Sequence, residues 1–227
     1  MFIDEWFDSG FYKELATGYR NQFAFGQFYW THAYYPHENL LLWRPVPDPG
    51  EPTKTVASKF QLEAAGADAF RRAIPLQAPK LETNEEFIGI RAKFRPVVLI
   101  QPEMPIPETE NRGYSGRVHR KRCTVAQVFG LADVITQAPQ FSQTFIDRVR
   151  KMEYPQLMYL PKKAGLLDVD SLLRLDELQS VFTTHLDPRK VALSDDVSNI
   201  LRDQIQFLFT GKGPNEYTAL REELLRS

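Results

Sequence analysis

The sequence predicts an α+β domain that consists mainly of short strands, with helices added. Strand-like and helix-like segments are separated by proline- and glycine-containing turns, and they do not alternate regularly enough for a doubly wound sheet. The chain contains no internal repeat and no Ser/Gly-rich linker, which favours a single domain over residues 1–227. A chain of this length buries about 70% of its unfolded surface, so its core needs no disulfide or metal.

The composition limits the classes of function. The 28 basic and 29 acidic residues give a formal charge of -1, which excludes nucleic-acid binding by bulk charge and leaves a local basic patch open. The lone cysteine, Cys123, cannot form an internal disulfide, so a reducing, cytoplasmic location is expected. The acidic N-terminus lacks the order of a signal peptide, and no apolar run suits a membrane span, so no membrane partner is expected.

The N-terminal 24 residues are expected to form a helical extension. Phe7, Phe11, Leu15 and Tyr19 are four residues apart, so they would share one stripe of a helix. The aromatic, β-prone segment that follows, 25–31, predicts a first strand.

Residues 37–92 are expected to form an insert. The segment 40–43 is typical of a short strand, and the prolines between 45 and 52 then oppose regular structure. Apolar residues spaced three and four apart predict a helix over 58–74, which Pro75 would end.

The second half of the chain contains both buried-strand and helix patterns. Ser194 is expected to cap a helix whose first turn contains Asp195 and Asp196, and Gly211 is expected to end it. A tail helix is expected over 216–226. Periodicity predicts strands and a short helix before Ser194, with the strands at 95–100, 124–131, 156–160 and 171–178 and the helix at 141–152.

Few motifs indicate a chemistry directly. The sequence has no phosphate-binding glycine loop, no HExxH and no paired CxxC, so no cofactor is expected. Its four histidines are scattered, so no metal site is expected. Cys123 begins an apolar strand, which favours a buried small residue; a nucleophilic role would need a base partner that the sequence does not identify.

A basic segment precedes the strand expected over 124–131. Several cations on a loop and strand start are able to hold RNA phosphates, and a solvated strand edge is the alternative explanation. The candidate RNA-binding residues are Arg117, His119, Arg120, Lys121 and Arg122.

Three segments in order along the chain resemble the MazF/PemK family of toxin–antitoxin ribonucleases. The first is the glycine, polar and aromatic run at 26–30. The second, 86–100, contains an acid, a spacer and an Arg-Pro-Val-Val strand. The third combines the strand and polar turn at 171–181 with Leu186 and the helix that follows Ser194.

The resemblance implies an SH3-like small barrel, usually a homodimer, that acts on single-stranded RNA or, in the wider CcdB/PemK superfamily, on a gyrase-type partner. An antitoxin protein is a candidate partner on the same ground. The resemblance assigns 25–36 and 93–210 to a barrel core with a C-terminal helix. The N-terminal helical extension at 1–24 and the helix-containing insert at 37–92 are additions to the family pattern, and a tail helix is expected within 211–227.

The family's ribonucleases cut RNA without a metal. The ribose 2'-hydroxyl attacks the adjacent phosphate, protein cations stabilise the phosphorane, and acid and base groups move protons. Arg95 matches the arginine of the family's Arg-Pro motif, so the resemblance implies that its guanidinium stabilises the phosphorane. The alternative is a structural arginine that pairs with an acid such as Glu86.

The family's catalytic threonine has no counterpart in this sequence. Its place falls on Phe129 or Ala132, neither of which can transfer a proton. Candidates to replace it are Asp133, Thr124, His32 and His37, of which Asp133 and His32 join Arg95 as the expected catalytic residues.

Two functions stay open at this stage. The first is a metal-independent endoribonuclease toxin. The second is a catalytically inactive relative that binds RNA or a protein partner; it is favoured by the missing threonine and by the insert, which replaces a short loop beside the family's RNA groove.

Overall fold

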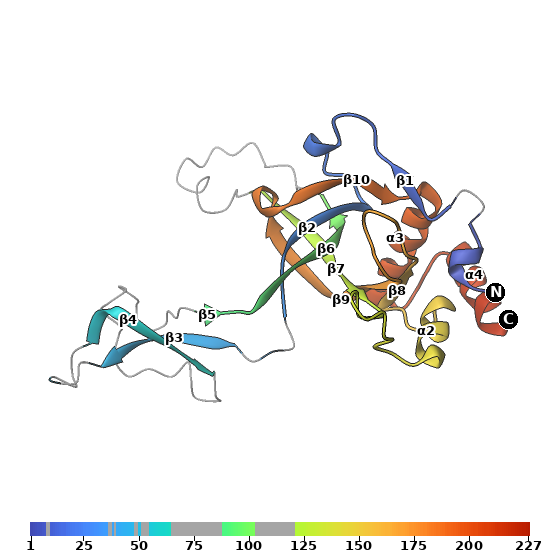
Figure 1. Ribbon diagram of the computed structural model, residues 1–227. Helices are drawn as coiled ribbons and strands as arrows, with labels where there is room; N and C mark the ends of the chain where they lie inside the picture. The colour runs from blue at the N-terminus through green and yellow to red at the C-terminus, as the bar shows by residue number, and fades with distance from the viewer. Residues whose placement is uncertain are drawn as a thin grey trace. The chain divides into compact units, whose positions relative to one another are not determined.

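The computed structural model describes residues 1–7, 10–35, 38, 40–47, 50, 55–64, 88–102 and 121–227. The chain divides into two compact units, of which one joins Met1–Ala33 to Phe94–Ser227 and the other is Tyr34–Lys93. The first unit is α+β and mainly β, as the sequence predicts (Figure 1).

A large sheet forms the first unit. Over the described residues it has seven strands in the order β1-β10-β2-β6-β7-β9-β8. Because β1 and β8 lie at its two edges, the described sheet is open, and the closed barrel that the resemblance implies is not confirmed. The strands are β1 Tyr12–Glu14, β2 Gln27–Tyr34, β6 Ala92–Gln101, β7 Arg122–Gly130, β8 Leu157–Leu160, β9 Ser171–Phe182 and β10 Asp187–Leu193.

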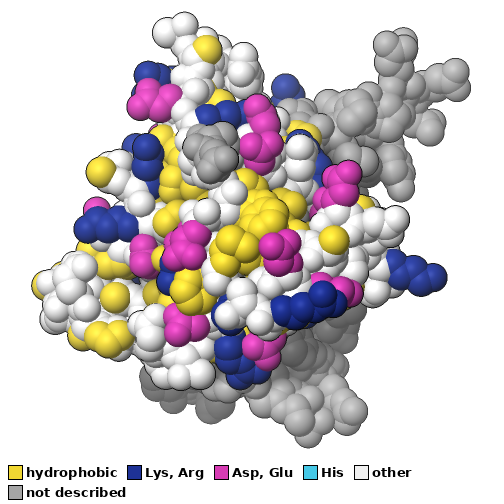
Figure 2. All heavy atoms as spheres, turned by 90° about the vertical axis from the view of Figure 1, so that its right-hand side faces the viewer, with side chains coloured by type: hydrophobic (Ala, Val, Ile, Leu, Met, Phe, Trp, Pro, Cys, Tyr) yellow, Lys and Arg dark blue, Asp and Glu magenta, His cyan; other side chains and the backbone are white. Residues whose placement is uncertain are grey.

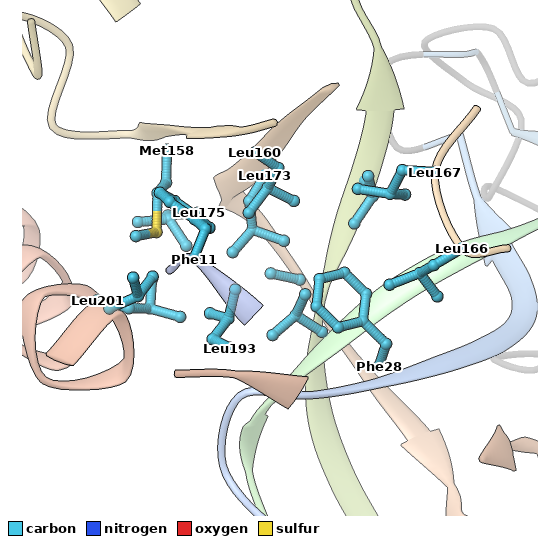
Figure 3. Close-up of a cluster of buried hydrophobic side chains, with 14 residues drawn as sticks. Phe11, Phe28, Met158, Leu160, Leu166, Leu167, Leu173, Leu175, Leu193 and Leu201 are labelled. Carbon is cyan, nitrogen blue, oxygen red and sulfur yellow. The ribbon is translucent and has the colours of Figure 1, made fainter. Parts of the chain in front are cut away.

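The main core lies between this sheet and helix α3 (Asp195–Thr210). Phe28 of β2, Leu173 of β9 and Leu193 of β10 pack with Leu201 of α3, and all four side chains are fully buried (Figure 3). Burial of such side chains contributes about 1.5–3 kcal/mol each and holds the helix against the sheet.

Alternate residues of the same strands fill a second cluster. Tyr29, Val97, Leu99 and Val125 are fully buried together on the other side of β2, β6 and β7. Burial on both sides explains why β6 and β7 have nearly continuous apolar sequences.

The helices begin and end close to their expected residues. Ser194 Oγ accepts a hydrogen bond from the backbone N–H of Val197, and Gly211 ends α3 with a φ of 69°. Helices α2 (Gln143–Arg150) and α4 (Asn215–Arg226) confirm the other two predictions. No helix among the described residues is both long enough and apolar enough to cross a membrane.

The expected N-terminal helix is wrong. Residues 1–24 contain the short turns η1 (Ile3–Glu5) and η2 (Tyr19–Asn21) and the strand β1. Gly10 and Gly18 have φ values of 81° and 103°, in the left-handed region that interrupts a right-handed helix.

The second unit contains β3 (Leu41–Pro47), β4 (Thr55–Ala64) and β5 (Ile88–Gly89), in the order β4-β3-β5. The helix expected over 58–74 is wrong where it overlaps β4, because antiparallel pairing with β3 outweighs the local periodicity. The remaining positions, 65–74, lie outside the described residues.

Strand β3 also continues through two prolines that were expected to prevent regular structure. Strand β5 pairs with β3 at Leu41 and Leu42 only. At Pro45 and Pro47, β3 therefore pairs with β4 on one side, and its other side is an edge of the described sheet. A proline is tolerated at such an edge because its missing N–H is not needed there.

Candidate nucleic-acid interface

The expected RNA-binding segment leads into β7. Its described members, Lys121 and Arg122, are both exposed, and the other three lie outside the described residues. Arg122 pairs in register with Phe182 at the end of β9. Its guanidinium carbon lies 4.6 Å from the centroid of the Phe182 ring, which is a cation–π contact.

A hollow of about 560 Å³ opens beside this pair. Two hydrogen bonds fix its wall. The Thr183 N–H donates to the carbonyl of Lys121, the residue before β7, at 3.1 Å, and Thr31 Oγ1 of β2 donates to the His185 carbonyl at 2.9 Å. The hollow is lined by Lys121, Phe182, Thr183, Thr184 and His185.

The side chains at this hollow combine charge, hydroxyl and aromatic groups. His185 approaches Phe182 edge-on, with ring centroids 5.4 Å apart. Thr184 and His185 are exposed, and Phe182 is half-buried. Lysine, arginine and hydroxyl groups donate to phosphate oxygens, and aromatic rings stack on bases, so the set suits a nucleic-acid strand.

A second group of rings lies where β10, β2 and β6 are neighbours. The rings of Trp30 and His32 on β2 lie 5.4 Å and 5.2 Å from the ring of Phe94 on β6. The guanidinium of Arg189 on β10 lies 5.6 Å from the Trp30 ring. Trp30, His32, Phe94 and Arg189 are called the aromatic platform below.

Arg95, the expected phosphate stabiliser, faces away from this platform. Successive residues of a strand point to opposite faces, so Arg95 lies on the other side of β6 from Phe94. Its side chain is buried, at 7% exposure, and its guanidinium lies 4.3 Å from the centroid of the Phe129 ring. Its alternative partner, Glu86, lies outside the described residues.

A second arginine makes a cation–π contact with the Phe129 ring. The guanidinium carbon of Arg174 on β9 lies 5.7 Å from the same ring. Arg174 donates two hydrogen bonds to Asp176, at 2.7 Å and 2.8 Å. The surroundings of Arg95 are therefore those of a packed structural group.

Asp133, the second expected catalytic residue, caps its own turn. Its Oδ1 accepts from the backbone N–H groups of Ile135 at 3.0 Å and Thr136 at 2.7 Å, and from the Thr136 hydroxyl at 3.0 Å. A carboxylate in this arrangement fixes a loop. His32, the third, contacts Phe94 on the face opposite Arg95, so the structure does not bring the three into one group.

The side of the molecule that carries both termini offers a different surface. Ser227 Oγ donates to the Met1 carbonyl at 3.2 Å, so the chain ends lie side by side. Figure 2 shows this side, where Lys and Arg are interspersed with Asp and Glu around a central group of hydrophobic side chains. The described residues of this side form no continuous basic surface that would attract a phosphate backbone.

The described part of the chain contains no cluster of metal-ligating side chains, and its cysteine is buried. Among those residues, no three His, Cys, Asp or Glu side chains cluster closely enough to hold a metal ion. Cys123 is 3% exposed, as its place at the start of an apolar strand predicts.

Comparison with known proteins gives no independent indication of function. The sequence matches no known protein-family model, and no curated protein is significantly similar to it. The MazF/PemK relationship therefore stays a prediction from the three sequence segments.

Proposed function

We propose that this protein is a MazF/PemK-like module that binds single-stranded RNA without cleaving it. The observation that carries the proposal is the stack of Arg122 on Phe182 beside the hollow that contains Lys121 and His185. Lys121 and Arg122, the last residues of the basic segment, therefore lie next to an aromatic ring and to side chains that donate hydrogen bonds.

The size and chemistry of the hollow support a nucleotide ligand. Its volume of about 560 Å³ falls within the roughly 300–1,000 Å³ typical of small-ligand pockets. Arginine and lysine at its rim neutralise phosphates, which makes the predicted affinity dependent on salt. Phe182 offers a ring beside them, which suits a strand with unpaired bases.

The separation of the expected catalytic residues supports binding over cleavage. Attack by a 2'-hydroxyl needs a cation and proton-transfer groups within hydrogen-bond reach of one phosphate. Arg95 is buried on Phe129, the Asp133 carboxylate fixes its own turn, and His32 lies on the opposite face of the sheet from Arg95. The endoribonuclease function would need these groups to rearrange together.

Several expectations that come with the resemblance belong to the same proposal. They are an SH3-like barrel relationship for the main sheet, a homodimeric state and an antitoxin partner. Their support is the resemblance of the three sequence segments, with the α+β architecture of the first unit consistent with it. A cytoplasmic location is proposed with them on the separate ground of the lone Cys123.

Fluorescence anisotropy with a labelled single-stranded RNA at low salt tests the binding function. We expect the wild-type protein to bind and Arg122→Ala to bind about tenfold more weakly, which corresponds to about 1.4 kcal/mol. Arg226→Ala is the matched control, because Arg226 is an exposed arginine of α4 paired with Glu222. Absence of wild-type binding at low salt would contradict the proposal.

A further inference from the structure

We propose that the aromatic platform stacks unpaired bases of an RNA strand whose phosphates lie at the Arg122–Phe182 hollow. This inference rests on the proposed function and assigns it a second subsite. The residues of this subsite are Trp30, His32, Phe94 and Arg189. Among them, only His32 is a candidate site residue from the sequence.

The platform has the exposure that stacking requires. Phe94 is 47% exposed, His32 is exposed and Trp30 is half-buried, although aromatic side chains of this size are usually covered in a strand. Their rings lie 5.2–5.4 Å apart in neighbouring strands, so they form one surface. Every base has a π-face, so such a surface binds single strands with little sequence preference.

The platform acts mainly through its rings, because its cation is already paired. Arg189 Nη2 lies 2.9 Å from Asp187 Oδ2, and both side chains are substantially exposed. This carboxylate offsets the charge that Arg189 would present to a phosphate. In this proposal Lys121 and Arg122 meet the phosphates, and the platform stacks the bases.

The two subsites are joined by the segment that leads from β9 into β10. His185 lines the hollow and Arg189 belongs to the platform, and four residues span at most about 14 Å. Thr31 Oγ1 of β2 donates to the His185 carbonyl at 2.9 Å, which ties this segment to the strand that carries Trp30 and His32. Because side chains alternate along a strand, Thr31 reaches the segment from the face opposite those two rings. The backbone separation of the two subsites is therefore short enough for one RNA strand to span.

Charge complementarity favours RNA as the occupant over a second copy of this chain. The neighbouring hollow contributes Lys121, and Arg122 lies beside it over Phe182. An RNA strand supplies phosphates for these cations together with bases for the rings. A second copy would bring its own platform and its own cations to the contact, so like charges would face one another.

The test compares variants of the two subsites by anisotropy over a series of salt concentrations. The probes are labelled oligouridylate and an abasic oligomer of the same length. We expect Phe94→Ala to bind oligouridylate about tenfold more weakly, with an unchanged salt slope and unchanged affinity for the abasic oligomer. Arg122→Ala should weaken binding to both probes and reduce the salt slope by about one.

Two further variants make the outcome specific. Phe94→Trp keeps an aromatic face and should retain wild-type affinity. Phe209→Ala is the matched control, because Phe209 is a 68% exposed phenylalanine on α3 outside the platform. Its affinity for oligouridylate should equal that of the wild type.

The possible failures are distinguishable. If the wild-type protein binds neither probe at low salt, the proposed function fails and the platform inference with it. If the wild type binds and folded Phe94→Ala binds oligouridylate equally well, only the platform inference is overturned. If Phe94→Ala keeps RNA affinity and changes the sedimentation coefficient to that of a smaller species, the platform is a contact between subunits and the inference is likewise overturned.

Discussion

Arg122 and Phe182 occupy paired positions of β7 and β9, with the guanidinium carbon 4.6 Å from the ring centroid. Cross-strand neighbours of this kind hold each other in place, so the cation is positioned before any ligand arrives. The ring is half-buried and lies nearly perpendicular to the His185 ring. A cation held over an aromatic ring distinguishes this arginine from the freely solvated strand-edge residue that is its alternative explanation.

Arg122→Lys tests whether the stack matters in addition to the charge. Lysine keeps the charge and loses the planar guanidinium that lies over Phe182, so we expect RNA affinity between those of the wild type and Arg122→Ala. Anisotropy titrations at one salt concentration measure it. If Arg122→Lys binds as tightly as the wild type, the ring contact contributes nothing to the interface.

Gly26→Ala is expected to destabilise the fold by about 1–3 kcal/mol. Gly26 has a φ of 81°, and a Cβ at this position would lie 2.7 Å from Ser198 Oγ on α3. Its backbone also accepts from Leu193 at 2.9 Å and donates to Leu99 at 2.8 Å, so it has little freedom to move away. Urea unfolding measures the change, and an unaltered midpoint would contradict this account of the glycine.

Arg150→Ala is expected to lower the free energy of unfolding by about 1–3 kcal/mol. Arg150 of α2 donates to Asp4 at 2.8 Å and 2.6 Å, and its guanidinium lies 3.9 Å from the Phe2 ring centroid. The Arg150 and Asp4 side chains are 18% and 16% exposed, so removing the arginine leaves a poorly solvated carboxylate. Urea unfolding measures this loss.

Arg226→Ala provides the surface comparison for that measurement. Its ion pair with Glu222 is highly exposed, so its removal should cost at most about 0.5 kcal/mol. Equal losses in the two variants would show that Arg150 does not anchor the N-terminal segment.

Acidification is expected to remove stability contributed by surface carboxylates. The hydrogen bond and charge of Arg148 lower the pKa of Glu153, and those of Lys190 lower the pKa of Glu14. A lowered folded-state pKa gives stabilisation that is present above the unfolded value, near pH 4.5, and is lost as pH falls through the folded value. Urea midpoints measured down this range should fall, and less steeply for Glu153→Gln. An unchanged slope in that variant would exclude the Arg148–Glu153 pair as a source of the effect.

Much of the fold could be predicted wherever local pattern and burial agree. Strands β6 and β7 are buried on both sides, and α3 has a Ser194 cap and a Gly211 end, so their sequences carry strong local signals. Strand β10 lacks such a signal, because its Asp187–Leu193 span is polar along most of its length and forms through pairing with β1 and β2.

In two segments that were expected to be helical, pairing with a distant strand outweighed the helical spacing. In the N-terminal segment, Phe11 keeps the expected burial, but it packs into the sheet core from beside β1. In β4, pairing with β3 replaces the expected helix.

The candidate site was only partly visible for a similar reason. The basic residues up to Arg122 stand out as a run in the sequence, whereas Phe182 and His185 belong to no motif. They join Arg122 because β7 pairs with β9, and local spacing does not predict that register. His32 is a catalytic candidate in the sequence and lies in the aromatic platform in the structure. The aromatic residues Trp30 and Phe94, which it lies beside, are the sequence feature that could have indicated this role.

The most direct test of binding without cleavage follows one sample of labelled single-stranded RNA mixed with wild-type protein in a chelator at low salt. Anisotropy reports binding, and a denaturing gel of the same sample reports the length of the RNA. The account predicts that anisotropy rises, that the rise reverses with added salt, and that the RNA stays at full length. Metal-independent cleavage that is lost in folded Arg95→Ala would contradict it and would establish Arg95 as part of a nuclease site.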